Sequence, residues 1–346
     1  MNGDGVARVV VTRGSAAESV HRVHIVVADA AGAVRAAAGD PRHFAFWRSA
    51  AKPVQALCLV ESGAADAFDL EAADLAIACG SHTGTPAHVA AARRLLGRAG
   101  REPADLACGP HAPEDAAAAA ALSALGLAPQ PLHNNCSGKH AGMIAACVHA
   151  GWPIAGYRSP GHPLQRWIQA AVRDVTGVEP VVGVDGCGVP TFGMPLAAMA
   201  VAYARLASGT GLTARRAAAA GRLGDAMAAH PEAVAGPGYA NTLLLALHGD
   251  RLLTKGGAEG VWCAGLRGPG SGLGIALKVE DGAGRASVPA LCAVLSALDL
   301  PGGGDPRLAG VGRPELRNTL GEVVGILEAD LPAGFAAARQ GTAGPS

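Results

Sequence analysis

The stretches Val6-Ala-Arg-Val-Val-Val-Thr12 and Arg22-Val-His-Ile-Val-Val-Ala28 decide the fold at one end of this chain. Both are rich in β-branched residues and alternate in polarity, which predicts paired strands separated by a polar segment, with a third strand at 33–38. Strand-like segments return near the other end, at 251–254, 259–264 and 273–280. We therefore expect an α+β fold whose central, mostly antiparallel sheet is built from both chain ends.

Between these strands, apolar residues recur at helical spacing. The expected helices are 49–62, 85–97, 114–125, 139–150, 163–175, 195–207 and 213–229, with another at 287–298 after the sheet. This pattern predicts one enzymatic domain over residues 1–346. Its sheet parts fall at about 5–40 and 240–300, its helical part at about 49–235, and residues 341–346 form a disordered tail.

Composition narrows the classes of partner. The 346 residues carry a formal net charge of zero at pH 7 and no basic block, so a nucleic acid is excluded as the expected partner. We find no signal-peptide core and no long uncharged apolar span, which predicts a cytoplasmic protein without a membrane partner. Eight cysteines without a Cys-x-x-Cys pair argue against a disulfide framework. We expect a homodimer that acts on a small molecule.

Lysine is rare here: four lysines stand against 24 arginines. Arginine serves wherever a plain positive charge suffices, so the lysines are candidates for a neutral amine base or ligand. In Ser49-Ala-Ala-Lys52-Pro53, positions i and i+3 share a helix face, and Pro53 fits the first turn. A desolvated lysine can activate such a serine. The structural alternative is a helix-capping serine followed by a surface lysine.

A second candidate pair combines Ser81, in Cys79-Gly-Ser81-His82, with Lys255, in Lys255-Gly-Gly-Ala-Glu259. The two glycines after Lys255 are expected to let a substrate approach the backbone closely. Ser-x-x-Lys early in the chain and Lys-x-Gly late is the order of penicillin-recognising serine hydrolases. Alone, the serine segment is equally typical of a polar turn.

A third constellation, His133-Asn-Asn-Cys136-Ser-Gly-Lys139-His140, precedes an apolar helix. The segment Asp185-Gly-Cys187-Gly188 follows strand-like residues 181–184 and lacks the strand–helix spacing of a dinucleotide site. Two thiolates with a third ligand are able to bind Zn²⁺ and leave one position for water.

In order along residues 8–300, the chain resembles the rhizobial-type (class 3) L-asparaginases. The segments that carry the resemblance are Arg48–Pro53, Cys79–His82, His133–Met143, Tyr157–Pro163, Asp185–Gly188 and Lys255–Gly260. The resemblance implies a fold like that of the serine β-lactamases and glutaminases. It also implies two Ser–Lys tandems, Ser49/Lys52 and Ser81/Lys255. A single zinc per chain would be held by Cys136, Lys139, Cys187 and water, with no organic cofactor.

The resulting interpretation is hydrolysis of the side-chain amide of L-asparagine to L-aspartate and ammonia. Ser49 attacks the amide carbon, Lys52 takes its proton, and Ser81 and Lys255 relay protons or exchange roles with the first pair. Which tandem supplies the nucleophile stays open, as does whether zinc orients substrate or makes hydroxide.

Four further side chains complete this interpretation. Arg48 is the candidate for the α-carboxylate and Asp185 or Glu259 for the α-ammonium, with His140 near the zinc. The alternatives are a β-lactamase-like or esterase-type serine hydrolase and a non-enzymatic amino-acid- or zinc-binding domain.

Overall fold

The computed structural model describes residues 5–268 and 272–335. Contacts divide the chain into two compact units. The first gathers residues 1–50, 194–211 and 251–346, and the second gathers residues 51–193 and 212–250. The expectation of one enzymatic domain stays a prediction. Residues 341–346, the expected disordered tail, lie outside the described part of the chain.

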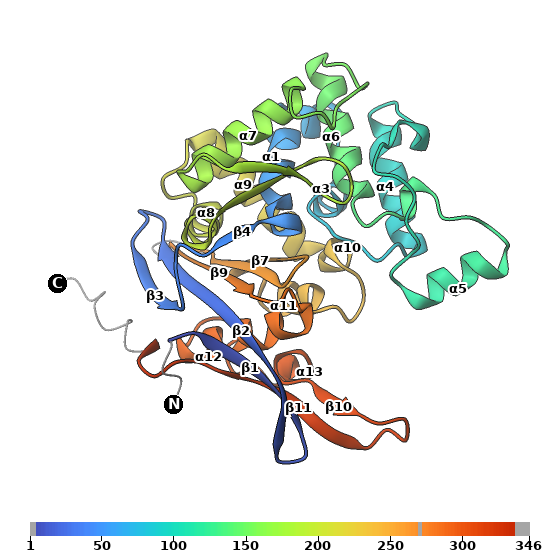
Figure 1. Cartoon of the computed structure of the whole chain (residues 1–346). Helices are drawn as coiled ribbons and strands as arrows, with labels where there is room; N and C mark the ends of the chain where they lie inside the picture. The colour runs from blue at the N-terminus through green and yellow to red at the C-terminus, as the bar shows by residue number, and fades with distance from the viewer. Residues whose placement is uncertain (1–4, 269–271, 336–346) are drawn as a thin grey trace. The chain divides into compact units, whose positions relative to one another are not determined.

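The first unit is built on an antiparallel sheet that has eight strands within the described residues. Their order is β10-β11-β1-β2-β9-β8-β7, and β3 also pairs with β2. The strands are β1 (Ala7–Arg13), β2 (Ala16–Asp29), β3 (Val34–Ala38), β7 (Leu252–Gly257), β8 (Val261–Leu266), β9 (Leu273–Val279), β10 (Glu315–Arg317) and β11 (Val323–Asp330). Figure 1 shows strands from the two chain ends side by side. The predicted α+β class, with an antiparallel sheet drawn from both ends, is confirmed.

Two features of this sheet differ from the expectation. Strand β2 begins at Ala16, so most of the polar segment expected between two strands is itself strand, and Arg13 pairs with Glu18 across the hairpin at 2.7 Å. Strands β10 and β11 come from residues beyond 300, where no strand was expected. In β11 the side chain of Leu327 is buried, whereas Val323, Glu328 and Asp330 are exposed, so the strand shows no regular alternation of apolar and polar residues.

A pair of glycines lets a helix lie directly on the sheet. Gly265 of β8 and Gly274 of β9 are register partners. A Cβ at Gly265 would overlap the carbonyl oxygen of Tyr203, and one at Gly274 would overlap that of Ala200. Both carbonyls belong to α8 (Leu196–Ser208), which packs against β8, β9 and β2. Glycine is therefore required at this interface.

The rest of the first unit comprises shorter elements and one further long helix. They are β4 (Phe44–Phe46), α12 (Ser287–Ala297), α13 (Ala309–Gly312) and the 3₁₀ helices η1 (Arg48–Ala51), η4 (Gly284–Ala286) and η5 (Pro306–Leu308). Helix α12 packs against β9 and β11.

The second unit is mainly helical, and α1 lies at its centre, in contact with α6, α7 and α9. Its elements are α1 (Lys52–Glu61), α2 (Ala64–Ala67), α3 (Ala72–Ala78), α4 (Pro86–Arg98), α5 (Ala116–Ala124), α6 (Ser137–Ala150), α7 (Pro163–Thr176), β5 (Val181–Val184), β6 (Pro190–Pro195), α9 (Ala214–Ala229), α10 (Pro231–Val234) and α11 (Ala240–His248). The helix expected at 49–62 is divided: a 3₁₀ turn at 48–51 leads into α1, with Pro53 in its first turn as predicted.

Among the described helices, none combines the length and the apolar character that crossing a membrane requires.

Candidate functional site

Lys52 is the first residue of α1, and its side chain is fully buried. Its Nζ lies 2.8 Å from Oγ of Ser81 and donates to the carbonyl oxygens of Gly80 (2.5 Å) and Asn135 (3.3 Å). Burial lowers the pKa of Lys52 from its ordinary value. The ammonium form donates to all three oxygens, and after loss of one proton the lone pair of the neutral amine can accept from the Ser81 hydroxyl. Lys52 is thus placed to act as a base toward Ser81.

Ser81 is held by the backbone around it. Gly80 lies where a Cβ would be 2.6 Å from the carbonyl oxygen of Ala233, so only glycine fits there. The amide of Ser81 donates to Val234 (2.7 Å), and the next amide, that of His82, donates to Asn135 (3.2 Å). These two backbone hydrogen bonds hold the loop after α3 in place, and so they position Ser81 next to Lys52.

The buried imidazole of His82 also holds this loop in place. Nδ1 of His82 accepts from the amide of Gly84 at 3.2 Å, and Nε2 lies 2.8 Å from Oγ of Ser137, which itself donates to Leu132. These partners assign the proton to Nε2. Burial holds the pKa of His82 well below its usual value, so the ring is neutral and its role is to brace the loop.

The first unit contains the other Ser/Lys residues. Lys255 in β7 is buried, and its Nζ donates to the carbonyl of Gly256 at 2.7 Å. A Cβ at Gly257 would lie 3.0 Å from the carbonyl oxygen of Trp47 and 3.2 Å from the amide of Ala50. The end of β7 therefore lies against the segment that contains Ser49. At Gly257 the chain itself makes a close approach, and the approach of a substrate to these glycines stays a prediction.

Arg48 and Glu259, two of the expected substrate-binding residues, share an unusual backbone. Their φ angles are +53° and +60°, in the left-handed region that favours glycine. Glu259 lies in the turn between β7 and β8, and its carbonyl accepts from Nζ of Lys278 at 2.7 Å. Such backbone conformations concentrate at functional sites.

Cys136, Lys139 and Cys187 come together in the second unit, and all three are buried. Cys136 caps α6, Lys139 lies in its first turn, and Cys187 lies in the turn between β5 and β6, with its Sγ 3.1 Å from Nζ of Lys139. A hydrogen bond between the two sulfurs lowers the pKa of Cys136 well below its usual value and raises that of Cys187. Burial disfavours the charge on Lys139, but the two neighbouring sulfurs outweigh it and raise its pKa. These shifts favour the thiolate at Cys136, the thiol at Cys187 and the ammonium at Lys139.

This donor set fits the expected zinc. Two sulfurs and one amine nitrogen leave one open position of a tetrahedron, provided that Cys187 and Lys139 lose their protons to the metal. Within residues 5–268 and 272–335, no three His, Cys, Asp or Glu side chains gather as a metal-binding group. A metal here would therefore depend on Lys139 as its third ligand, and the zinc stays a prediction.

His140 and Asp185 flank this cluster. His140 follows Lys139 on α6, is fully buried, and has Nδ1 2.6 Å from the hydroxyl of Tyr157. Asp185 begins the turn that contains Cys187 and accepts from the amide of Gly186 at 2.9 Å. Its charge is among those that raise the pKa of Lys139. Both expected residues are thus in the same unit as the cluster.

Tyr157 and Arg158 have no role predicted from the sequence, although both lie in a segment that carries the resemblance. The guanidinium of Arg158 covers Gly188, where a Cβ would overlap it. Arg158 and Tyr157 also help to line a cavity of about 410 Å³ in the second unit. Only the folded chain reveals that this segment meets the Asp185–Gly188 turn and His140.

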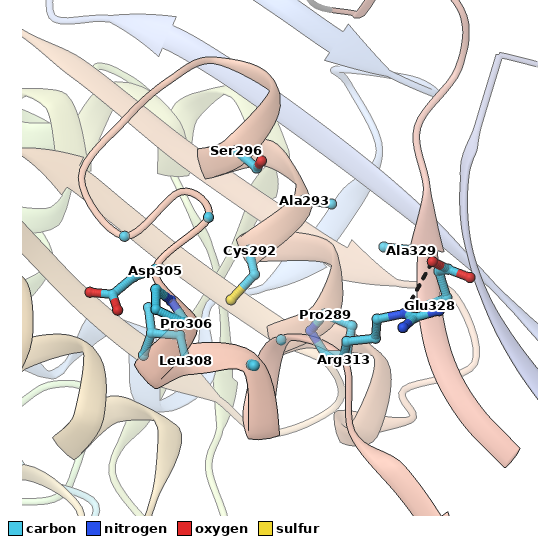
Figure 2. Close-up of a pocket in the computed structure, with 14 residues that line it drawn as sticks. Pro289, Cys292, Ala293, Ser296, Asp305, Pro306, Leu308, Arg313, Glu328 and Ala329 are labelled. Carbon is cyan, nitrogen blue, oxygen red and sulfur yellow. Dashed lines mark hydrogen bonds and ion pairs between the residues drawn. The ribbon is translucent and has the colours of Figure 1, made fainter.

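A separate cavity of about 400 Å³ lies in the first unit, between α12, α13 and β11 (Figure 2). The sulfur of Cys292 faces it, and an ion pair of Arg313 with Glu328, 3.1 Å long, lies at its edge. Burial raises the pKa of Cys292 to about 11, so this sulfur stays a thiol. None of the expected catalytic, substrate-binding or metal-ligating residues lines this cavity.

The chain was compared with known proteins and protein families. No curated protein matches the chain. The model of the family described as L-asparaginase II matches residues 9–329, which is nearly the whole chain and includes every candidate residue of both units. The chain therefore belongs to the L-asparaginase II family and is an enzyme that hydrolyses amides.

Proposed function

We propose that this enzyme hydrolyses the side-chain amide of L-asparagine to L-aspartate and ammonia by a Ser/Lys mechanism. The family supports asparaginase activity. The observation that carries the mechanism is the buried amine of Lys52, 2.8 Å from the hydroxyl of Ser81 and three residues after Ser49.

In the proposed reaction, Oγ of Ser49 attacks the side-chain amide carbon and Lys52 takes the serine proton. The hydroxyl of Ser81, bonded to Lys52, passes a proton to the amide nitrogen. The C–N bond breaks, ammonia leaves and an acyl-serine ester remains. Water then cleaves the ester, which releases L-aspartate and restores the serine. Lys255 supplies a second buried amine for the proton transfers.

One observation favours the opposite assignment of the two serines. Because Nζ of Lys52 contacts the hydroxyl of Ser81 directly, Ser81 is the second candidate for the nucleophile. The acylated residue identifies which serine attacks, for example by mass spectrometry of an enzyme quenched during turnover.

Substrate selection requires a cation for the α-carboxylate and an anion for the α-ammonium. We assign Arg48 to the first role, Asp185 or Glu259 to the second, and His140 to a substrate oxygen. The left-handed backbone of Arg48 and Glu259 supports their assignment.

Cys136, Lys139 and Cys187 would hold the proposed zinc. When bound, zinc would supply a Lewis acid that orients and polarises a substrate oxygen. The chain's own part is to keep these ligands buried and to fix Cys187 through the turn that starts at Asp185.

We extend the proposal to a serine β-lactamase-like fold, a homodimer and cytoplasmic residence. An antiparallel sheet that packs against α8 and α12 supports the first of these. A small molecule, with no nucleic acid, is the proposed partner, in keeping with the zero net charge.

The test is ammonia release from L-asparagine, L-glutamine and β-aspartyl dipeptides, measured side by side, with nitrocefin hydrolysis in parallel. We expect L-asparagine to be the best substrate by kcat/KM. Preference for nitrocefin would favour the β-lactamase-like alternative. Membership of an enzyme family argues against the binding-only alternative.

A further inference from the structure

His140 and Tyr157 form a buried pair in the second unit. His140 is 0% exposed and Tyr157 is 2% exposed, and their rings meet edge to face with centroids 5.5 Å apart. Nδ1 of His140 lies 2.6 Å from the hydroxyl of Tyr157. The same hydroxyl accepts from the amide of Ala107 at 3.0 Å.

These contacts determine which ring nitrogen of His140 carries the proton. The hydroxyl of Tyr157 accepts from Ala107, and its own proton has an acceptor when it points to Nδ1 of His140. The neutral ring then carries its hydrogen on Nε2. The opposite tautomer would leave the hydroxyl proton of Tyr157 without an acceptor among the contacts of the described residues, which is unfavourable.

The nitrogen that carries this hydrogen, Nε2 of His140, is buried and has no hydrogen-bond partner in the described part of the chain. A buried donor is costly unless an acceptor reaches it. Arg158, whose guanidinium covers Gly188 in the same unit, supplies a permanent positive charge near this pair. An acceptor in these surroundings is favoured when it carries negative charge.

We infer that Tyr157 is a positioning residue: it fixes His140 as the Nε2–H tautomer, which donates to an oxygen of the substrate's α-carboxylate. The inference rests on the proposed function for the identity of the substrate. Tyr157 does not touch the substrate; it determines that His140 offers a donor and not a lone pair, which would repel a carboxylate.

The first experiment is kinetic. Tyr157→Phe keeps the ring and removes the hydroxyl, so His140 can adopt either tautomer; we expect KM for L-asparagine to rise about tenfold, with kcat changed less than about threefold. His140→Leu should raise KM at least as much, and adding Tyr157→Phe to it should change KM no further. For 3-aminopropanamide, which lacks the α-carboxylate, KM should be the same for wild type and Tyr157→Phe.

The matched control is Thr176→Val, which removes another buried hydroxyl, on α7, that donates to Val172 and Val178. It should lower the melting temperature without raising KM. If Tyr157→Phe behaves like this control, Tyr157 only stabilises the fold and the inference is overturned. A KM increase that is equal for 3-aminopropanamide would also overturn it, because the acceptor would then be a water or another substrate atom.

A second readout does not depend on activity. The ¹⁵N shifts of the His140 ring, assigned by their loss in His140→Leu, should report hydrogen on Nε2 in the wild type and a tautomer mixture in Tyr157→Phe. Hydrogen on Nδ1 in the wild type would refute the inference. If the wild type released no ammonia from any amide, the proposed function would fail, while the tautomer assignment would still be decided by these spectra.

Discussion

Replacing Lys52 with methionine distinguishes a catalytic role of this lysine from a role in the stability of the fold. The side chain is fully buried at the start of α1, and its amine meets the hydroxyl of Ser81 and the carbonyls of Gly80 and Asn135. Methionine is similar in length and apolar, so Lys52→Met keeps the packing and removes only the amine.

The magnitudes of the two effects are expected to differ. Loss of a positioned base lowers kcat by roughly 10²–10⁴-fold, or about 3–5 kcal/mol in the barrier. On the folding side, two carbonyls lose a donor at ~1–3 kcal/mol each. The methylenes of Lys52 are buried in both proteins, so their burial cancels, and the variant no longer buries an amine, which offsets part of this cost. The net cost to the free energy of unfolding is therefore at most about 2–6 kcal/mol, comparable with the stability of an ordinary domain.

The assay is ammonia release under saturating L-asparagine, together with urea unfolding of each variant. Gln55→Met is the matched control because Gln55 is also buried on α1 and loses only a 3.4 Å hydrogen bond to the carbonyl of Pro190. It should keep kcat within a few-fold of the wild type. If folded Lys52→Met keeps more than about a tenth of the wild-type kcat, Lys52 is not the base and the reasoning fails.

Three more predictions follow from the site. Ser49→Ala should lower kcat by roughly a thousandfold or more because the covalent route is lost, and Ser81→Ala should lower it less; the reverse order of the two rates would make Ser81 the nucleophile. Elemental analysis should find about one zinc per chain, absent from a Cys136→Ser/Cys187→Ser double variant, and equal zinc content in the two proteins would place the metal elsewhere. Since burial lowers the pKa of Lys52 and the base must be neutral, kcat/KM should fall as pH decreases and protonates the amine; a flat profile from about pH 5 to 9 would contradict this.

Regular amphipathic segments were predictable from the sequence, and weakly patterned ones were not. The helices expected at 163–175 and 213–229 match α7 and α9 because their apolar stripes are long and end in clear turn signals. Helix α11 and strand β11 were missed. The first is a short run of leucines and polar residues, and the second carries exposed acidic residues that strands usually avoid. Tertiary pairing with β1, which no local pattern encodes, is what makes β11 a strand.

In the candidate site, too, spacings within one segment were predictable from the sequence, whereas contacts between distant segments were not. The spacing of Ser49 and Lys52 is local and could be read directly, whereas the contact of Lys52 with Ser81 joins residues 29 positions apart. Likewise, 48 residues separate Lys139 from Cys187, and only the resemblance to a family brought them together before the fold did. No spacing rule relates Tyr157 to His140, because the turn between α6 and α7 determines that contact.

The scarcity of lysine is nevertheless the sequence feature that anticipated the site best, and the fold supplies its physical reason. Lys52, Lys139 and Lys255 are all buried, whereas Lys278, which was expected to be a solvated side chain, is only half-buried. Burial lowers the pKa of Lys52, an effect that arginine cannot use because its guanidinium keeps its proton in proteins. A chain that otherwise relies on arginine for positive charge therefore retains lysine mainly in its interior, and at Lys52 this burial favours the neutral amine.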